Sequence, residues 1–150
     1  MESQAVRDAI LHLACRLDLT QGGSSIDPRP DARRRSLYVK HSRDEQSLFL
    51  AMFDDADILA CYRRNESVVP QQALAMANSR LALEMSEATP SVIGEQLGDQ
   101  EFSGKAFQRV LCRRPTSDEL AECTEFLKQI PNRARLIHAL LNHNDFLMIR

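Results

Sequence analysis

Apolar residues recur at intervals of three and four along most of the chain, which is the spacing of one face of an α-helix. The first such stripe predicts a helix over residues 3–17, and its members are Val6, Ile10, Leu13 and Leu17. Paired glycines and two prolines then predict a loop as far as residue 31. Residues 37–39 alone suit a strand, and only a short one.

Further helices are predicted downstream, most of them bounded by prolines. An apolar stripe over residues 48–53 predicts a second helix, which is followed by three aspartates. The next helix is expected to begin at Pro70 and to end at Pro90. Its inward face should consist of Leu74, Ala77, Leu81 and Met85. A short helix over residues 91–98 should end at Gly98.

The C-terminal third predicts a helical hairpin over residues 103–130. Thr116 and Glu119 have the spacing of a capping box, in which a hydroxyl and a carboxylate satisfy the first amides of a helix. A final helix should begin at Pro131. The prediction is therefore an all-α fold: an irregular multi-helix assembly with a C-terminal hairpin plus final helix, and at most one short extended segment near 36–40. Its length suits a single domain over residues 1–150.

Composition narrows the classes of partner. A hydrophobic content of 43% with 27% charged residues is typical of a folded protein. A net charge of −2 argues against whole-domain attraction to nucleic acid, which needs a basic surface. No apolar run approaches the roughly 20 residues of a membrane span. Charged and polar residues interrupt the apolar stretch within residues 1–15, which therefore predicts an amphipathic helix and not a signal peptide. Any export signal should lie outside this chain.

The sequence contains none of the cysteine motifs that commonly bind a metal or haem. The four cysteines form no C-x-x-C pair, which leaves out the zinc-ribbon, thioredoxin-like and c-type haem motifs; they are Cys15, Cys61, Cys112 and Cys123. No metal or other cofactor is therefore predicted. Buried free thiols are expected, with a Cys112–Cys123 disulfide as the alternative. The G-x-S-x-G signature of a nucleophile elbow does not occur either.

Charge is unevenly distributed along the chain. Residues 29–43 hold six basic side chains and one acidic one, whereas residues 84–101 hold five acidic side chains and no basic one. The basic stretch could contact a polyanion, or it could pair with the acidic segment of the same chain. We favour the second interpretation, because neutral proteins often separate charge in this way.

The densest polar cluster lies between two predicted helices and gives the candidate binding residues Asp54, Asp57, Arg63, Arg64, Glu66 and Gln72. Arginine pairs with carboxylates in a two-pronged geometry, so this cluster is expected to brace the two helices. The alternative is a pocket for an anionic or sugar-like ligand. A glycosidase would need two of the acids about 5–10 Å apart across a cleft. If the cluster is an interaction site, an apolar or conserved-looking concave face should lie beside Pro70, and a uniformly charged surface there would count against it.

Six segments, in order, carry a family resemblance: RDAIL…RLD…GG at 7–23, RRSLYV at 34–39, LFLAMFD at 48–54, CYRRNESVVPQQALAMANS at 61–79, RRPTSDEL at 113–120 and HALLNHNDFLMIR at 138–150. The chain resembles the C-terminal domain of unknown function found in large exported planctomycete proteins. Those proteins carry a cytochrome-c-like haem module near their N-terminus. Since this chain has no C-x-x-C-H, any electron transfer would belong to other modules.

The resemblance implies that the chain is the C-terminal part of a larger, exported protein and docks against the preceding domains. It also implies that Arg34 and Arg35 serve the fold, and that Cys15 and Cys112 stand where relatives often have glycine. We therefore expect a non-catalytic structural or interaction module. The alternative is a carbohydrate-active enzyme that uses Asp54 or Asp57 with Glu66. A third interpretation, an intracellular helical regulator, applies if Met1 is the natural start.

Overall fold

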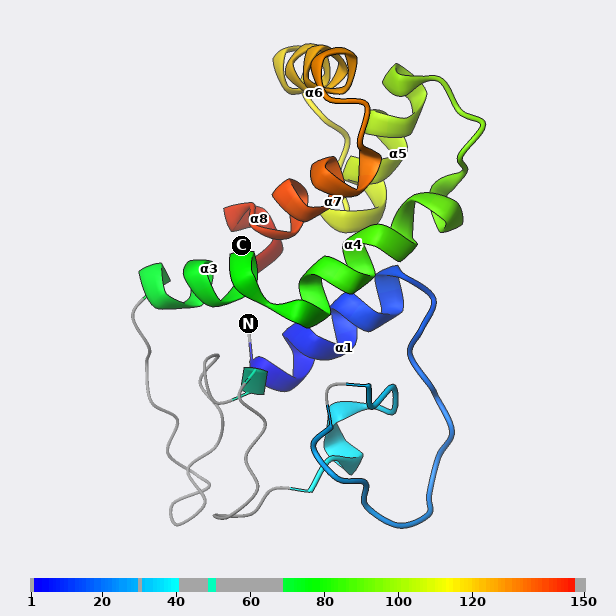
Figure 1. The fold of residues 1–150 in the computed structure, drawn as a ribbon, viewed down its shortest axis with the longest axis vertical. Coiled ribbons are helices and arrows are strands. Elements are labelled where there is room, and N and C mark those ends of the chain that lie inside the picture. The colour runs from blue at the N-terminus through cyan, green and yellow to red at the C-terminus, as the bar shows by residue number, and fades with distance from the viewer. Residues whose placement is uncertain (1, 30, 41–48, 51–68, 148–150) are drawn as a thin grey trace.

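The computed structural model describes residues 2–29, 31–40, 49–50 and 69–147, and these residues are largely helical (Figure 1). They contain seven α-helices, one short 3₁₀ helix and no strand, which confirms the predicted all-α class. The elements are α1 (Ser3–Leu13), η1 (Ser36–Tyr38), α3 (Val69–Asn78), α4 (Arg80–Ile93), α5 (Asp99–Val110), α6 (Ser117–Gln129), α7 (Arg133–Leu141) and α8 (Asn144–Leu147).

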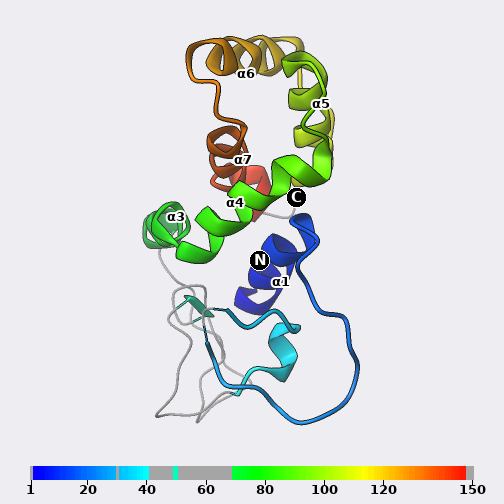
Figure 2. The same ribbon diagram turned by 45° about the vertical axis from the view of Figure 1, so that its right-hand side comes forward.

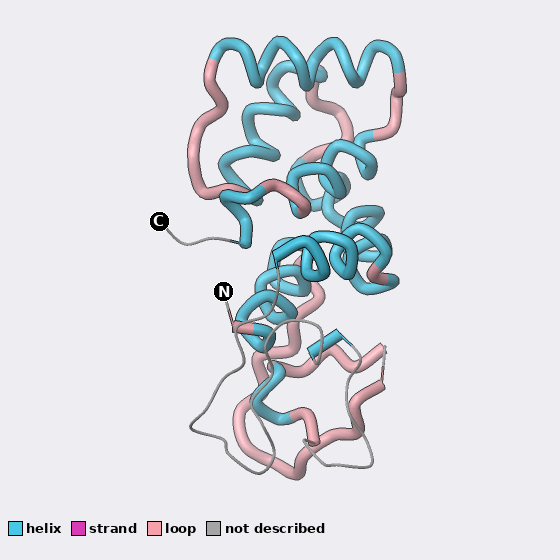
Figure 3. The backbone as a smooth tube through the Cα atoms, turned by 90° about the vertical axis from the view of Figure 1, so that its left-hand side faces the viewer, coloured by secondary structure: helices cyan, strands magenta, loops and turns pink. Residues whose placement is uncertain are grey.

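Helix α4 crosses the middle of the molecule and organises the other helices (Figure 1). It packs most extensively on α7, and it also contacts α1, α3 and α5. Helices α5 and α6 form the expected hairpin, and α6 crosses the end of the molecule between α5 and α7 (Figure 2). At the opposite end, the chain leaves α1 in a long loop and returns to it through η1 (Figure 3).

The core is built from aliphatic and phenylalanine side chains contributed by nearly every helix. Its fully buried members include Val6, Ile10, Leu11, Met76, Phe102, Ile137 and Leu141. Leu50, from the predicted stripe at 48–53, is helical and buried; the rest of that stripe lies outside the described residues, apart from helical Phe49. Each fully buried Leu, Ile, Val, Phe or Met side chain contributes about 1.5–3 kcal/mol, so the aliphatic stripes dominate the stability of the assembly.

The single helix predicted between Pro70 and Pro90 is wrong. The helix is interrupted at Ser79. The Ser79 side chain accepts a hydrogen bond from Ala82 N and so caps a new helix, α4. This break turns Leu74 and Ala77 outward, although both were expected in the core. Helix α4 then continues past Pro90 to Ile93 and ends at Gly94, which has a φ of 127°.

Three other local predictions are also corrected. Residues 91–93 belong to α4, and Gly98 is the N-cap of α5, not the end of a short helix. The predicted strand at 37–39 is replaced by the 3₁₀ helix η1, beside which Val39 makes one isolated bridge to Ile26. Helix α1 ends at Leu13, four residues before its predicted limit.

The first helix stops early because the next residues form a Schellman motif, a standard helix stop. Cys15 N donates to His12 O and Arg16 N donates to Leu11 O, both at 2.9 Å. Cys15 itself has a φ of 53°, and Cys112, just beyond α5, has a φ of 54°. This left-handed conformation favours glycine, so a side chain at either position is strained.

The prediction of buried thiols is wrong for the cysteines that the structure describes. Cys15 and Cys112 are exposed, and Cys123 is partly exposed; all three are free. Cys61 lies outside the described residues.

We predict that Cys112→Gly stabilises the chain. A side chain in the left-handed region costs roughly 1–2 kcal/mol, and the greater freedom of glycine in the unfolded chain offsets part of the gain. The free energy of unfolding, measured with urea, should rise by about 0.5–1 kcal/mol. Cys112→Ala is the control, because it removes the thiol but keeps the strained Cβ. Equal stability of the two variants would contradict this explanation.

The predicted capping box is confirmed, and it belongs to a larger clamp. Glu119 N donates to Thr116 Oγ1 and Thr116 N donates to Glu119 Oε2. Arg113 donates to both oxygens of Glu119, at 2.8 and 2.7 Å, and to Asp145 Oδ2 at 2.9 Å. The hydrogen bonds from Arg113, followed by those from Thr116, lower the pKa of Glu119 to about 2. One guanidinium thereby joins the turn before α6 to α8.

This clamp predicts a measurable loss of stability in acid. Because the pKa of Glu119 falls from 4.5 to about 2 on folding, its contribution is complete above pH 4.5 and disappears as the pH falls toward 2. In Glu119→Gln the free energy of unfolding should therefore decrease less steeply across that range. Glu122→Gln, which removes an exposed carboxylate from the same helix, is the control. Identical pH profiles for wild type and Glu119→Gln would refute the assignment.

Candidate functional site

Of the candidate binding residues predicted from the sequence, Gln72 is the one that the structure describes. It lies half-buried on α3. Asp54, Asp57, Arg63, Arg64 and Glu66 lie outside the described residues, so the polar cluster remains a prediction. Among the features of the described residues, three bear on function: a buried arginine on α1, an open pocket on the loop side, and the outer face of α3.

Arg7 is the most buried charged side chain in the described residues, with an exposed fraction of 5%. Its guanidinium donates to Ala32 O at 2.5 Å, to Arg34 O at 2.9 Å and to Ser36 Oγ at 3.1 Å. The neighbouring Asp8 accepts from Ser36 N and Ser36 Oγ at 2.8 and 2.7 Å. Two adjacent residues of α1 thus bind the returning segment. Burial is the largest influence on Arg7 and lowers its pKa, while the charge of Asp8 opposes the shift.

Arg34 holds the preceding loop together. It donates to the carbonyl oxygens of Thr20, Gly22 and Ser24, and its guanidinium lies 4.0 Å from the centre of the Tyr38 ring. Tyr38 Oη in turn accepts from Gly22 N at 2.8 Å. Arg34 therefore serves the fold, as the resemblance implied.

Other cations of the basic stretch are also paired within the chain. Arg33 lies 3.5 Å from Glu84 of the acidic segment, which agrees with the favoured interpretation of the charge pattern. Arg35 lies 3.8 Å from Asp8, and Lys40 lies 2.6 Å from Asp27. A polyanion would have to compete with these contacts at the described residues 31–40 of the stretch; Arg43 lies outside the described residues.

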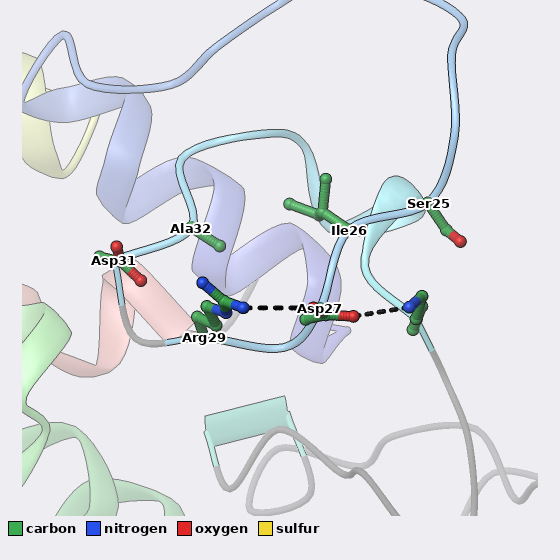
Figure 4. Close-up of a pocket in the computed structure, with 7 residues that line it drawn as sticks. Ser25, Ile26, Asp27, Arg29, Asp31 and Ala32 are labelled. Carbon is green, nitrogen blue, oxygen red and sulfur yellow. Dashed lines mark hydrogen bonds and ion pairs between the residues drawn. The ribbon is translucent and has the colours of Figure 1, made fainter.

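An open pocket of about 440 Å³ lies on the loop side of the molecule (Figure 4). Its lining residues are Ser25, Ile26, Asp27, Arg29, Asp31, Ala32 and Lys40. Asp27 accepts a hydrogen bond from Lys40 Nζ and lies 3.5 Å from Arg29 Nη2. The bond from Lys40, followed by its charge and that of Arg29, lowers the pKa of Asp27. This lining offers charge pairing and one hydroxyl, but no nucleophile paired with a base.

Carboxylates elsewhere in the described structure are also stabilised in their charged form. The pKa is lowered at Asp18, chiefly by the Thr20 hydroxyl, and at Glu84, chiefly by the Arg80 guanidinium. A general acid requires the opposite shift, which comes from burial in apolar surroundings. Within the described ranges, no group of three or more His, Cys, Asp or Glu side chains is arranged to hold a metal ion.

The outer face of α3 is the least expected of the three features. This ten-residue helix contains no charged residue. Ala75 and Met76 are buried, while Ala73, Leu74 and Ala77 are exposed, with 65% of Leu74 accessible. Surface helices ordinarily place charged or polar side chains on their outer face. The outer face of α3, the helix that contains Pro70, is therefore largely apolar and uncharged.

Sequence reasoning did not identify the three residues of this face correctly, because it assumed one continuous helix. The local signal was the pair Asn78-Ser79, since both residue types favour the N-cap position.

None of the helices in the part of the chain that the structure describes has the length and apolarity needed to cross a membrane.

We predict that Arg7→Met destabilises the chain strongly. The substitution leaves the carbonyls of Ala32 and Arg34 without their donor, and it removes the cation beside Asp8. Losing one partner of a buried polar network costs about 3 kcal/mol, which urea denaturation would measure. Arg16→Met is the control, because Arg16 is exposed and a surface change usually stays within about 0.5 kcal/mol. Similar values for the two variants would refute the role of Arg7.

Comparison with known proteins places the chain in one family. No curated protein and no solved structure matches it. A family model described as PSD1, protein of unknown function (DUF1553), matches residues 1–127. Because this match covers most of the 150 residues, the chain belongs to the PSD1 family of proteins of unknown function.

Proposed function

We propose that the chain is a non-catalytic interaction module, 1–150 forming one helical domain at the C-terminal end of a larger protein. The parent would be an exported protein of the planctomycete type, with a cytochrome-c-like haem module near its N-terminus. Its partners would be the preceding domains of the same polypeptide. The family match supports a conserved domain without assigning it a reaction.

The observation that carries this proposal is that the described carboxylates are paired with cations or stabilised in their charged form. Asp8, Asp99 and Asp145 each lie within ion-pair distance of an arginine. Every carboxylate with a shifted pKa among the described residues is shifted downward, namely Asp18, Asp27, Glu84 and Glu119. Such groups stay charged at neutral pH and support structure, whereas acid–base catalysis needs a group that keeps or exchanges its proton there.

The carbohydrate-active alternative depends on Asp54 or Asp57 with Glu66, all outside the described residues. Under our proposal, these acids pair with Arg63 and Arg64 and brace the connection before α3. An anionic or sugar-like ligand at the same cluster is the other form of this alternative. Turnover of a polysaccharide by the wild-type chain, lost in both Asp54→Asn and Glu66→Gln, would replace our proposal with the enzyme.

Hydrogen exchange tests the interaction module directly. Amide exchange would be compared between the isolated chain and the product of the complete natural reading frame. We expect one continuous set of surface amides to exchange at least tenfold more slowly in the longer product, because docking suppresses local opening. Equal exchange in both samples would refute the proposal, as would a reading frame that encodes no further domain.

A further inference from the structure

The outer face of α3 has the chemistry of a contact surface. Its exposed arc consists of Ala73, Leu74, Ala77 and Asn78, and its opposite arc holds the buried Ala75 and Met76. These positions follow the helical repeat of 100° per residue, so the two arcs are separate faces of one helix. We propose that the outer face of α3 is a docking surface, and that it receives an apolar, uncharged face of another domain of the same polypeptide. This inference rests on the proposed function.

The residues of the face indicate an apolar occupant. Ala73 and Ala77 lie one helical turn apart, and their small side chains permit close approach of another backbone, toward the lower end of the usual 8–10 Å between packed helices. Leu74 projects beside them and is 65% exposed. No residue of α3 carries a charge that could pair with an ion on the partner. A charged partner surface would therefore lose hydration here without compensation.

The size of the face indicates that the occupant is tethered. A ten-residue helix is about 15 Å long and 10–12 Å wide, so its outer half offers roughly 200–300 Å². A stable complex between separate proteins usually buries about 800 Å² on each partner. The outer face of α3 is thus too small to hold a free protein or a second copy of this chain. A domain joined to this chain by a short flexible linker would be present at roughly millimolar effective concentration, and a contact of this size would then suffice.

Helix α4 provides a matched control. Leu83 is also exposed, at 45%, but it lies among the charged residues Arg80, Glu84 and Glu87. Arg80 and Glu84 form an ion pair at 2.6 Å on this helix. Leu83 is therefore a single apolar side chain on a charged surface, which needs no partner to explain it.

The test combines Leu74→Glu and Leu83→Glu with hydrogen exchange in the full reading-frame product. We expect amides 73–78 to exchange at least tenfold more slowly in the wild-type product than in the isolated chain. Leu74→Glu should abolish that protection, whereas Leu83→Glu should retain it. Both substitutions should leave the melting temperature of the isolated chain nearly unchanged, which shows that each variant folds.

The outcomes separate this inference from the proposed function. If the longer product protects a different surface and α3 exchanges equally, the inference is overturned and the interaction module stands. If no surface is protected, both fail. Sedimentation of the isolated chain tests the occupant: a dimer at micromolar concentration that Leu74→Glu disrupts would make the partner a second copy and overturn our assignment.

Discussion

A buried guanidinium that binds main-chain carbonyls is the interaction on which the loop end of this molecule depends. The segment between α1 and η1 has almost no regular secondary structure, so its peptide groups lack the partners that a helix or sheet would supply. Arg7 provides donors for two of these carbonyls from inside the packed face of α1. With that anchor in place, the returning segment is held against the helix by polar contacts in addition to apolar ones.

Three other arginines of the described residues bind loop or helix-end carbonyls in the same way. Arg34 binds three carbonyls of its own loop, Arg109 binds Leu13 O at the end of α1, and Arg133 binds Glu95 O and Leu97 O between α4 and α5. Arginine suits this task because its planar group presents five donors in a fixed arrangement. In the described part of the chain, these arginines supply donors to loop carbonyls. Arg33 and Arg34 of the basic stretch are therefore engaged by contacts within the fold.

Sequence patterns predicted the features that depend on neighbouring residues. The capping box at Thr116 and the helical hairpin around it were predicted correctly, because both depend on residues that are close in the sequence. The break at Ser79 was missed, since apolar spacing alone continues across it. The contacts of Arg7 were beyond reach, because their partners lie 25 to 29 residues away in a segment without periodicity. The polar cluster before Pro70 remains a prediction, because five of its six residues lie outside the described part of the chain. The apolar face of α3 could be recognised only from the exposure of its side chains in the structure.

The residues with left-handed backbone conformation just beyond α1 and α5 also determine how readily the protein forms disulfides in an oxidising environment. Cys15 and Cys112 have the left-handed backbone conformation, and the thiols of both are free and exposed. Secreted proteins encounter oxidants that convert unpaired, accessible thiols into links between molecules. An exported form of this chain would therefore expose these sulfurs to oxidants unless another surface covered them. Handled alone in air, it would accumulate covalent oligomers whose junctions lie at the ends of α1 and α5.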